Sequence, residues 1–415
     1  MIEALCNRFG IDGAVREAAL RARERTTAIA YDAQRDVTAN VLQAFLDEGI
    51  AESDLIGSAG YGYDDPARDR YEALLARVFG AERALARLSI VSGTHAIVAA
   101  LAACAPPGTT LLSISGRPYD TLRNAICEAP HCLVRQGTAY DEIALREDGS
   151  VDLEAATRVL ATGAISAMFV QRSRGYAPRR SLSIAECQRV FAALKAIAPG
   201  VPILVDNCYG ELVEAREPTH AGADLVMGSL IKNLGGSIAP AGGYVAGRAE
   251  LVERVAARLY APGLAAGLGP SLGFGRSFVQ GLFLAPLVVE QCLRGLDFAA
   301  AIFEELGYGV DPKPGERRSD IAQAIRLGSP ERIARFARGF QAAMPVNARF
   351  RPEPGAVPGY TDPVIMSSGA FISGATIELS CDAPLRPPYD VYVQGGAVAA
   401  HAYLGALFAA RALVQ

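Results

Sequence analysis

Lysine is scarce in this chain: of its 40 basic side chains, only Lys195, Lys232 and Lys313 are lysines. Lys195 closes a helical stretch and Lys313 lies in a Pro/Gly loop, so both fit solvated charges. Lys232 instead lies in an apolar segment that ends in glycines (ADLVMGSLIKNLGG, 223–236). A lysine is seldom buried unless it is paired or used, and burial lowers its pKa and makes it a nucleophile or base. Lys232 therefore indicates Schiff-base chemistry.

Other absences narrow the class of protein. A formal charge of −4 argues against nucleic acid as the main partner, because phosphate binding needs clustered positive charge. The eight cysteines are scattered without a CxxC pair, which favours reduced thiols. Residues 1–30 lack a continuous apolar run, so no signal peptide is expected. The most apolar windows (about 90–105, 279–293 and 397–414) are interrupted by polar residues, Gly or Pro and indicate buried core, not membrane spans. We expect a cytoplasmic protein.

Short apolar runs alternate with helix-length segments through the middle of the chain. Such alternation predicts βαβ units and a mostly parallel, buried sheet. The strands are expected at 87–92, 109–115, 131–136, 164–171, 202–207, 223–230 and 242–247. A long helix is expected near 276–306, followed by helices near 319–326 and 330–343, strand-like alternation at 365–380 and a last helix at about 396–412. We therefore predict N-terminal helices (1–55) that contribute to a small domain, a large domain (56–295) and a C-terminal small α+β domain (296–415).

Three segments place polar groups at the C-terminal ends of predicted strands, where open α/β sheets bind ligands. The first is Ser92-Gly93-Thr94-His95, between a strand and a helix. Small residues at a helix start let backbone N–H groups approach a phosphate, and the helix dipole favours its negative charge. Taken alone, such a turn is more often an ordinary helix N-cap.

The other two segments follow successive strands. Asp206 ends the run ILVD (203–206) and could pair with a protonated ring nitrogen, although an N-cap or a metal ligand fits it as well. Ser229, three residues before Lys232, could donate to a phosphate, and Lys232 itself could be a structural lysine at the sheet edge. A phosphate site, an acid for a ring nitrogen and a lysine for an aldehyde together meet the needs of pyridoxal 5′-phosphate (PLP).

These motifs resemble those of the aluminium-resistance proteins, a family related to methionine γ-lyase and the cystathionine lyases among the fold-type I PLP enzymes. The matching segments run in order along nearly the whole chain: GYGYDDPARDR (60–70), SGTHA (92–96), GRPYDTL (116–122), QRSRGY (171–176), DNCYGE (206–211), GSLIKNLGGSIAPAGGYVAG (228–247) and RPPYDVYVQGG (386–396). The resemblance implies an α/β fold like that of aspartate aminotransferase, with a large mixed, mostly parallel seven-stranded sheet and a smaller α+β domain.

The resemblance also implies residue roles. Lys232 would form the Schiff base, Asp206 would contact the pyridine nitrogen, and the phosphate would bind at Gly93, Thr94 and Ser229. Ser92 would also contact the cofactor. Either His95 or Tyr119 would stack on the cofactor ring. Arg386 and Arg174 are candidates for the substrate carboxylate, since arginine binds carboxylates through two hydrogen bonds; Arg386 could equally form a structural salt bridge.

The resemblance further implies a homo-oligomer, a dimer or tetramer, with active sites between subunits. In related γ-lyases a Tyr-x-Arg pair from the neighbouring subunit reaches the phosphate. Here the similar loop reads Tyr61-Gly62-Tyr63, without the arginine.

The predicted function is a PLP-dependent lyase that acts at Cβ or Cγ of an amino acid. The freed Lys232 amine would be the general base at Cα, and Tyr61, Tyr63 or Tyr119 could assist the leaving group. Transamination and decarboxylation use the same cofactor-binding residues and stay open.

Gly269-Pro-Ser271-Leu-Gly273 with His401 matches the GxSxG pattern of hydrolases, but a Gly/Pro/Ala loop replaces the strand that this pattern needs. A non-catalytic PLP-binding or metal-tolerance protein is the last alternative, although no Asp, Glu and His cluster has metal-ligand spacing.

Overall fold

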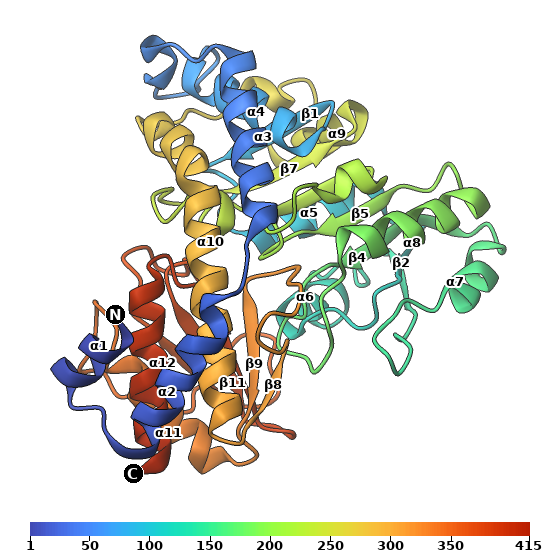
Figure 1. The fold of residues 1–415 in the computed structure, drawn as a ribbon. Coiled ribbons are helices and arrows are strands. Elements are labelled where there is room, and N and C mark those ends of the chain that lie inside the picture. Colours follow the sequence, from blue (N-terminus) through green and yellow to red (C-terminus); the bar gives the residue numbers. More distant parts are fainter.

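The computed structural model describes residues 1–415, arranged around two β-sheets that one long helix connects (Figure 1). The α-helices are α1 (Ile2–Phe9), α2 (Gly13–Thr27), α3 (Asp32–Glu48), α4 (Pro66–Phe79), α5 (Gly93–Cys104), α6 (Asp120–Arg123), α7 (Leu153–Leu160), α8 (Ile184–Ile197), α9 (Ala249–Leu259), α10 (Gly275–Glu305), α11 (Pro330–Gln341) and α12 (Ala399–Val414). Short helical turns are η1 (Glu52–Leu55), η2 (Asn124–Glu128), η3 (Pro218–Ala221), η4 (Asn233–Gly235) and η5 (Ala265–Gly267).

The larger sheet has seven strands in the order β1-β7-β6-β5-β4-β2-β3. Its strands are β1 (Arg83–Arg87), β2 (Thr110–Ser113), β3 (Ala139–Glu142), β4 (Ile165–Gln171), β5 (Ile203–Asp206), β6 (Leu225–Ser229) and β7 (Gly243–Gly247). The five strands from β6 to β3 pair in parallel, whereas β7 is antiparallel to both β6 and β1. The sheet is therefore mixed and mostly parallel, as predicted.

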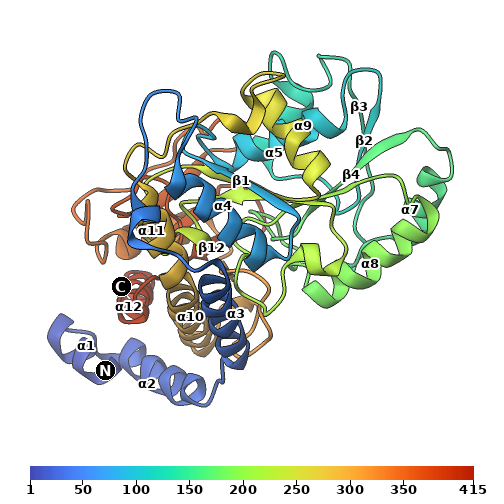
Figure 2. The same cartoon turned by 90° about the horizontal axis from the view of Figure 1, so that it is seen from above.

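Both faces of this sheet are covered by helices, which explains its apolar strands. Along β6, Leu225 and Met227 point to the face covered by α5 and α9, while Val226 points to the opposite face, which α4 and α8 cover (Figure 2). Successive side chains of a strand alternate between faces, so a strand buried on both sides is a nearly continuous apolar run. This burial keeps the strand ends, and the polar residues that follow them, in fixed positions.

Three predicted elements were wrong. The run 87–92 is mostly the connection into α5, and β1 ends at Arg87. Segment 131–136 forms turns, because the N–H groups of Leu133 and Val134 bond back to Ala125 and Ile126; the strand follows at β3. The helix predicted near 319–326 contains instead β9 (Ala322–Arg326), which pairs with a strand on each side. In that segment sheet pairing overrides the helix propensity of its alanines.

The smaller sheet is antiparallel throughout, with the order β10-β11-β12-β9-β8. Its other strands are β8 (Gly309–Asp311), β10 (Val364–Ser368), β11 (Ser380–Pro384) and β12 (Asp390–Gln394). Helices α1 and α2 lie beside α10 and α12 near this sheet, whereas α3 packs against α4 and α10 (Figures 1 and 2). The boundaries at residues 55 and 295 stay predictions. No helix has both the length and the apolar character that a membrane crossing requires.

Helix α10 spans 31 residues and contacts both sheet regions (Figure 1). Near its N-terminal end it meets the turn that follows Lys232, backbone against backbone. A Cβ atom added to Gly281 would lie 2.5 Å from the carbonyl oxygen of Gly235, so only glycine permits this approach.

Candidate active site

A cavity of about 200 Å³ opens between the carboxyl ends of the large-sheet strands and one face of the small sheet. The large-sheet side contributes Thr94, Tyr119, Thr121, Gln171, Ser173, Gly175, Tyr176, Asp206, Cys208, Tyr209 and Lys232. The small-sheet side contributes Val357, Tyr360, Val364, Met366 and Asp382. The structure thus brings the predicted Lys232, Asp206, Thr94 and Tyr119 together in one place.

Lys232 follows β6 and begins the turn η4. Its Nζ lies 4.0 Å from the centroid of the Tyr209 ring. Burial lowers the pKa of the Lys232 ammonium, but the acidic groups of Cys208, Tyr209 and Asp206 outweigh burial and raise it well above its ordinary value. The expectation that burial dominates was therefore wrong. When only the protein's own groups surround it, the Lys232 side chain is a cation. Its amine therefore has to lose a proton before it can act as a nucleophile.

Asp206 is the last residue of β5 and is 4% exposed. Its Oδ1 accepts a hydrogen bond from the Cys208 N–H at 3.0 Å, and burial raises the pKa of its carboxyl group. A cation placed beside Asp206 would favour the ionised form. A protonated ring nitrogen is such a cation.

The first turn of α5 lies beside Ser229. The Ser92 hydroxyl caps the helix by accepting from the His95 N–H at 3.1 Å, so its side chain has the structural role considered above. A Cβ added to Gly93 would meet Cys208 Sγ at 3.2 Å and Ser229 Cβ at 3.3 Å. The first N–H groups of a helix have no partner within it, and those of Gly93 and Thr94 therefore offer donors for an anion.

Of the two candidates for ring stacking, only Tyr119 lines the cavity. Its hydroxyl lies 3.1 Å from Thr94 Oγ1, and its N–H donates to Gln171 Oε1 at 2.9 Å. The His95 ring instead accepts from the Val91 N–H at 3.3 Å on the outer side of the turn. The structure thus brings Tyr119, and not His95, into the cavity.

Tyr61 and Tyr63 lie outside the cavity of their own chain. They are 74% and 60% exposed, and their rings are 5.8 Å apart. Their loop packs on the segment around Gly269, whose N–H donates to the Tyr61 carbonyl at 3.0 Å. Any action of these two tyrosines on the cavity requires a second copy of the chain.

Both candidate arginines line a polar cavity of about 340 Å³ that adjoins the first one and shares Tyr119, Gln171 and Tyr176 with it. Arg386 pairs with Asp120 at 3.0 Å. Arg174 is buried and pairs with Asp311 at 2.7 Å, while its Nε has no partner.

Two further arginines, Arg117 and Arg179, line the same adjoining cavity. Arg179 was not singled out from the sequence. Burial lowers its pKa to about 10, and it donates to the Ser173 carbonyl at 2.8 Å. The adjoining cavity is therefore suited to an anion such as a carboxylate.

Several cavity residues escaped prediction although they lie within recognised motifs. Tyr176 ends the segment QRSRGY, and Cys208 and Tyr209 lie in the segment DNCYGE. Both segments follow predicted strands, and this position could have indicated that their residues reach the cavity. Asp382 carried no signal, because β11 reaches the cavity only through the folding of the small sheet.

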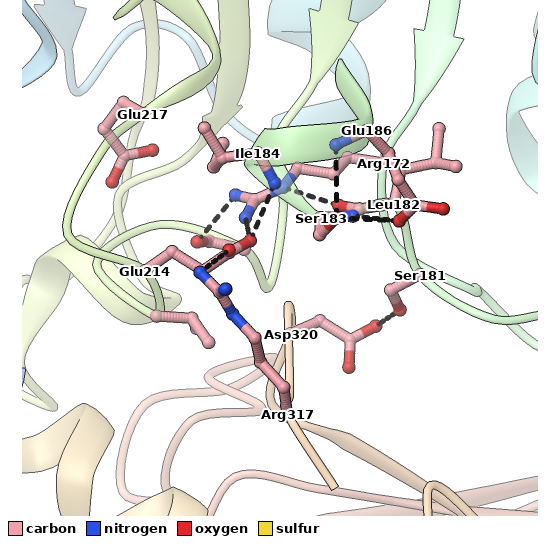
Figure 3. Close-up of polar contacts among 12 residues, drawn as sticks. Arg172, Ser181, Leu182, Ser183, Ile184, Glu186, Glu214, Glu217, Arg317 and Asp320 are labelled. Atoms are coloured by element: carbon pink, nitrogen blue, oxygen red, sulfur yellow. Dashed lines mark hydrogen bonds and ion pairs between the residues drawn. The ribbon is translucent and has the colours of Figure 1, made fainter. Parts of the chain in front are cut away.

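A buried ion-pair network ties the ends of β4 and β5 together (Figure 3). Arg172 donates to Asn207 Oδ1, the Gly210 carbonyl and Glu214 Oε1 at 2.8, 2.9 and 2.8 Å. Figure 3 shows Glu214 between Arg172 and Arg317, which reaches Glu214 Oε2 at 2.8 Å. The Arg172 N–H also bonds to the Asp206 carbonyl at 3.1 Å. The network therefore helps to fix the backbone that carries Asp206.

Replacing Arg172 by glutamine should lower the free energy of unfolding by about 3 kcal/mol, because it removes the internal cation of the buried Glu214. Arg317 provides the matched control, since it pairs with the same carboxylate but its side chain is 73% exposed. R317Q should cost less than about 1 kcal/mol. Urea unfolding followed by circular dichroism measures both, and equal losses would contradict the assignment.

A second buried acid, Glu211, gives a pH-dependent prediction. Its Oε1 accepts from the Tyr244 hydroxyl at 2.9 Å, its Oε2 has no partner, and burial raises its pKa from 4.5 to about 8. The folded state keeps this proton longer than the unfolded state, so the contribution to stability is complete below about pH 4.5 and is lost as the pH rises towards 8. The E211Q variant, neutral at every pH, should lose less thermal stability than the wild type between pH 6 and pH 9. The measurement is the melting temperature of both proteins at each pH. The same fall in melting temperature with pH in the wild type and in E211Q would refute this prediction.

The hydrolase alternative fails on geometry. Ser271 is buried and its hydroxyl donates to Asp65 Oδ1 at 3.0 Å, while His401 on α12 bonds the Ala343 carbonyl at 3.0 Å. Neither residue lines the cavity, and no strand precedes Ser271.

No group of three or more His, Cys, Asp and Glu side chains in the chain is arranged to hold a metal ion.

Known proteins resemble this chain over its whole length. The family model described as methionine gamma-lyase matches residues 14–414. The uncharacterized protein YnbB of Bacillus subtilis is 42% identical over 365 residues, which cover 87% of this chain and 86% of YnbB. A structure from Clostridium acetobutylicum is described as a candidate cystathionine β-lyase involved in aluminum resistance. It is 39% identical to this chain with a TM-score of 0.94, and the match covers 100% of this chain and 99% of the Clostridium chain. A carbon-sulfur lyase involved in aluminum resistance from Clostridium novyi is 39% identical with a TM-score of 0.92, covering 98% of each chain.

Proposed function

Because the chain belongs to the methionine gamma-lyase family, we propose that it is a PLP-dependent lyase that acts on L-amino acids. The bond to be broken joins Cβ or Cγ to sulfur or another heteroatom. The observation that carries the proposal is the meeting of Lys232, Asp206 and the first turn of α5 in one cavity.

The residues present fit PLP. Lys232 carries the one amine of the cavity and would hold the aldehyde, and the buried Asp206 would face the pyridine nitrogen. The surface formed by Gly93, Thr94 and Ser229 would receive the phosphate, and a Cβ at residue 93 would be tight there against the side chains of Cys208 and Ser229. When bound, PLP supplies an electron sink for the reaction at Cα.

The chain's own residues would then orient the substrate and move its protons. The adjoining cavity, with Arg386 and Arg174, would bind the α-carboxylate and so fix the direction of the substrate. Lys232, once its amine is free and deprotonated, would take the proton from Cα and return it where the reaction needs one. Tyr119 lies beside the same space with its hydroxyl towards Thr94, where it would stack on the ring and could assist the leaving group.

A dimer or tetramer is part of the proposal. Tyr61 and Tyr63 are exposed and lie away from the cavity of their own chain, as expected for residues that serve the site of a neighbouring copy. Their loop lacks the arginine of related γ-lyases, so we assign them to the substrate side of the site and not to the phosphate.

Product analysis of the purified, PLP-loaded protein tests the function. L-Cysteine, L-methionine, L-homoserine and γ-halogenated amino acids are each incubated with the enzyme. A lyase releases ammonia, a 2-oxo acid and the thiol, water or halide, with no net oxidation or reduction. Accumulation of pyridoxamine phosphate would indicate an aminotransferase, and release of carbon dioxide would indicate a decarboxylase; either result would overturn the lyase assignment.

A further inference from the structure

One carboxylate of the cavity, that of Asp382, has no task in the proposed reaction. Asp382 lies on β11 and is 3% exposed. Its Oδ2 accepts hydrogen bonds from the Tyr176 hydroxyl and, at 3.1 Å, from Gln394 Nε2. Its Oδ1 accepts no hydrogen bond from the protein, and the side chain lines the cavity. Two donors thus hold the carboxylate in place while its second oxygen is available to a ligand.

On the side of β10 the surroundings of Asp382 are apolar. In the register of the small sheet Met366 lies directly opposite Asp382, and Val364 lies two residues further along β10 on the same face. Both line the cavity together with Asp382. The small sheet therefore presents an apolar strip beside one carboxylate, which suits a side chain that is apolar along its length and charged at its end.

No cationic side chain forms an ion pair with this carboxylate. Lys232 lies over the Tyr209 ring, and its charge lowers the pKa of Asp382 without cancelling the effect of burial. Arg386 and Arg174 line the adjoining cavity and pair with Asp120 and Asp311. Burial raises the pKa of Asp382 to about 6, so the group is ionised at pH 7.5. An ionised carboxylate held away from water is costly unless it is paired.

We propose that Asp382 binds an ammonium group at the far end of the substrate side chain. The inference rests on the proposed lyase function and narrows it to amino acids whose leaving group carries its own amine. The α-carboxylate would bind in the arginine-lined cavity, the thioether chain would lie along Val364 and Met366, and the distal amine would donate to Asp382 Oδ1.

Two substrates of equal chain length isolate this contact. S-(2-aminoethyl)-L-cysteine ends in an ammonium group where S-propyl-L-cysteine ends in a methyl group. The wild type should cleave the first with a kcat/KM about tenfold higher or more, as expected for a hydrogen bond between charged groups. In D382N, which keeps the shape but removes the charge, this ratio should fall to about one, and D382E should restore part of it.

A binding measurement gives a readout that needs no turnover. L-Lysine and L-2-aminoheptanoic acid form the corresponding pair without a leaving group, and their dissociation constants follow from the absorbance change of the PLP-loaded protein. The wild type should bind L-lysine about tenfold more tightly, and D382N should bind both equally while retaining its PLP.

The outcomes separate the two proposals. Equal binding of L-lysine and L-2-aminoheptanoic acid by the wild type would overturn the role of Asp382 and leave the lyase function intact. A loss in D382N that is the same for both members of each pair would also overturn it, because a general effect on protonation or folding would then explain the change. A preference for L-lysine that depends on Asp382, without cleavage of any sulfur or oxygen substituent, would support the binding role and reject the lyase.

Discussion

Purified Lys232→Ala should fail to retain the yellow colour that PLP gives the wild type, and its turnover should fall by at least about 10³-fold. Lys232 is the one amine that lines the cavity, so nothing nearby replaces it. The remaining groups, Asp206 and the first turn of α5, would hold PLP only without a covalent bond, so gel filtration should remove it. Visible absorption after gel filtration measures the loss.

Lys313→Ala is the matched control, because Lys313 is an exposed lysine in a loop. It should keep both colour and activity. Borohydride reduction of the wild type should fix the cofactor to the peptide that contains Lys232, which mass spectrometry identifies among only three lysines. Labelling of Lys195 or Lys313 instead, or a colourless wild type that takes up no PLP, would reject the site.

Replacement of Asp206 by asparagine should leave PLP bound but lower kcat by about 10²-fold or more, in the range of losses seen when a charge that stabilises the transition state is removed. Asparagine keeps the shape of the side chain and can still accept from the Cys208 N–H. It cannot hold a proton on the pyridine nitrogen, so the electron sink weakens. Cofactor content and single-turnover rates separate these two effects.

Asp224 supplies the comparison for Asp206. It is also a buried acid beside β5, but it lies at the opposite end of the strand, where it accepts from the Ile203 N–H at 2.7 Å and pairs with Lys195 at 2.6 Å. D224N should therefore lower stability and leave kcat unchanged. Equal losses of kcat in D206N and D224N would mean that Asp206 only stabilises the folded structure and has no direct role in the reaction.

The sequence could predict that Lys232 and Asp206 lie close together, because local patterns were sufficient for this part of the candidate site. Lys232 and Asp206 each follow an apolar run, and parallel strands bring their carboxyl ends to one edge, so neighbouring strands place such residues together. The fold class and the family relationship predicted from the motifs are confirmed.

The remainder of the site depends on contacts between distant segments. Asp382 reaches the cavity because β11 lies between β10 and β12, a pairing that no local pattern specifies. The choice between His95 and Tyr119 depends on which way the first turn of α5 faces, because Thr94 and His95, which are adjacent in this helix, point in different directions: Thr94 contacts Tyr119, whereas His95 accepts from the Val91 N–H. The sequence left Arg386 and Arg174 undecided because only the folding of distant segments brings both to one cavity.

The contact between Gly281 and Gly235 couples the position of α10 to the turn that follows Lys232. Two backbones in direct contact have no side chains to absorb a displacement, so a shift of the helix moves the turn after Lys232 with it. The same helix packs against β8, β9 and β12 of the small sheet. One helix therefore contacts both the small sheet and the turn that follows the lysine. A methyl group added at position 281 would alter the chemistry at Lys232 from outside the cavity.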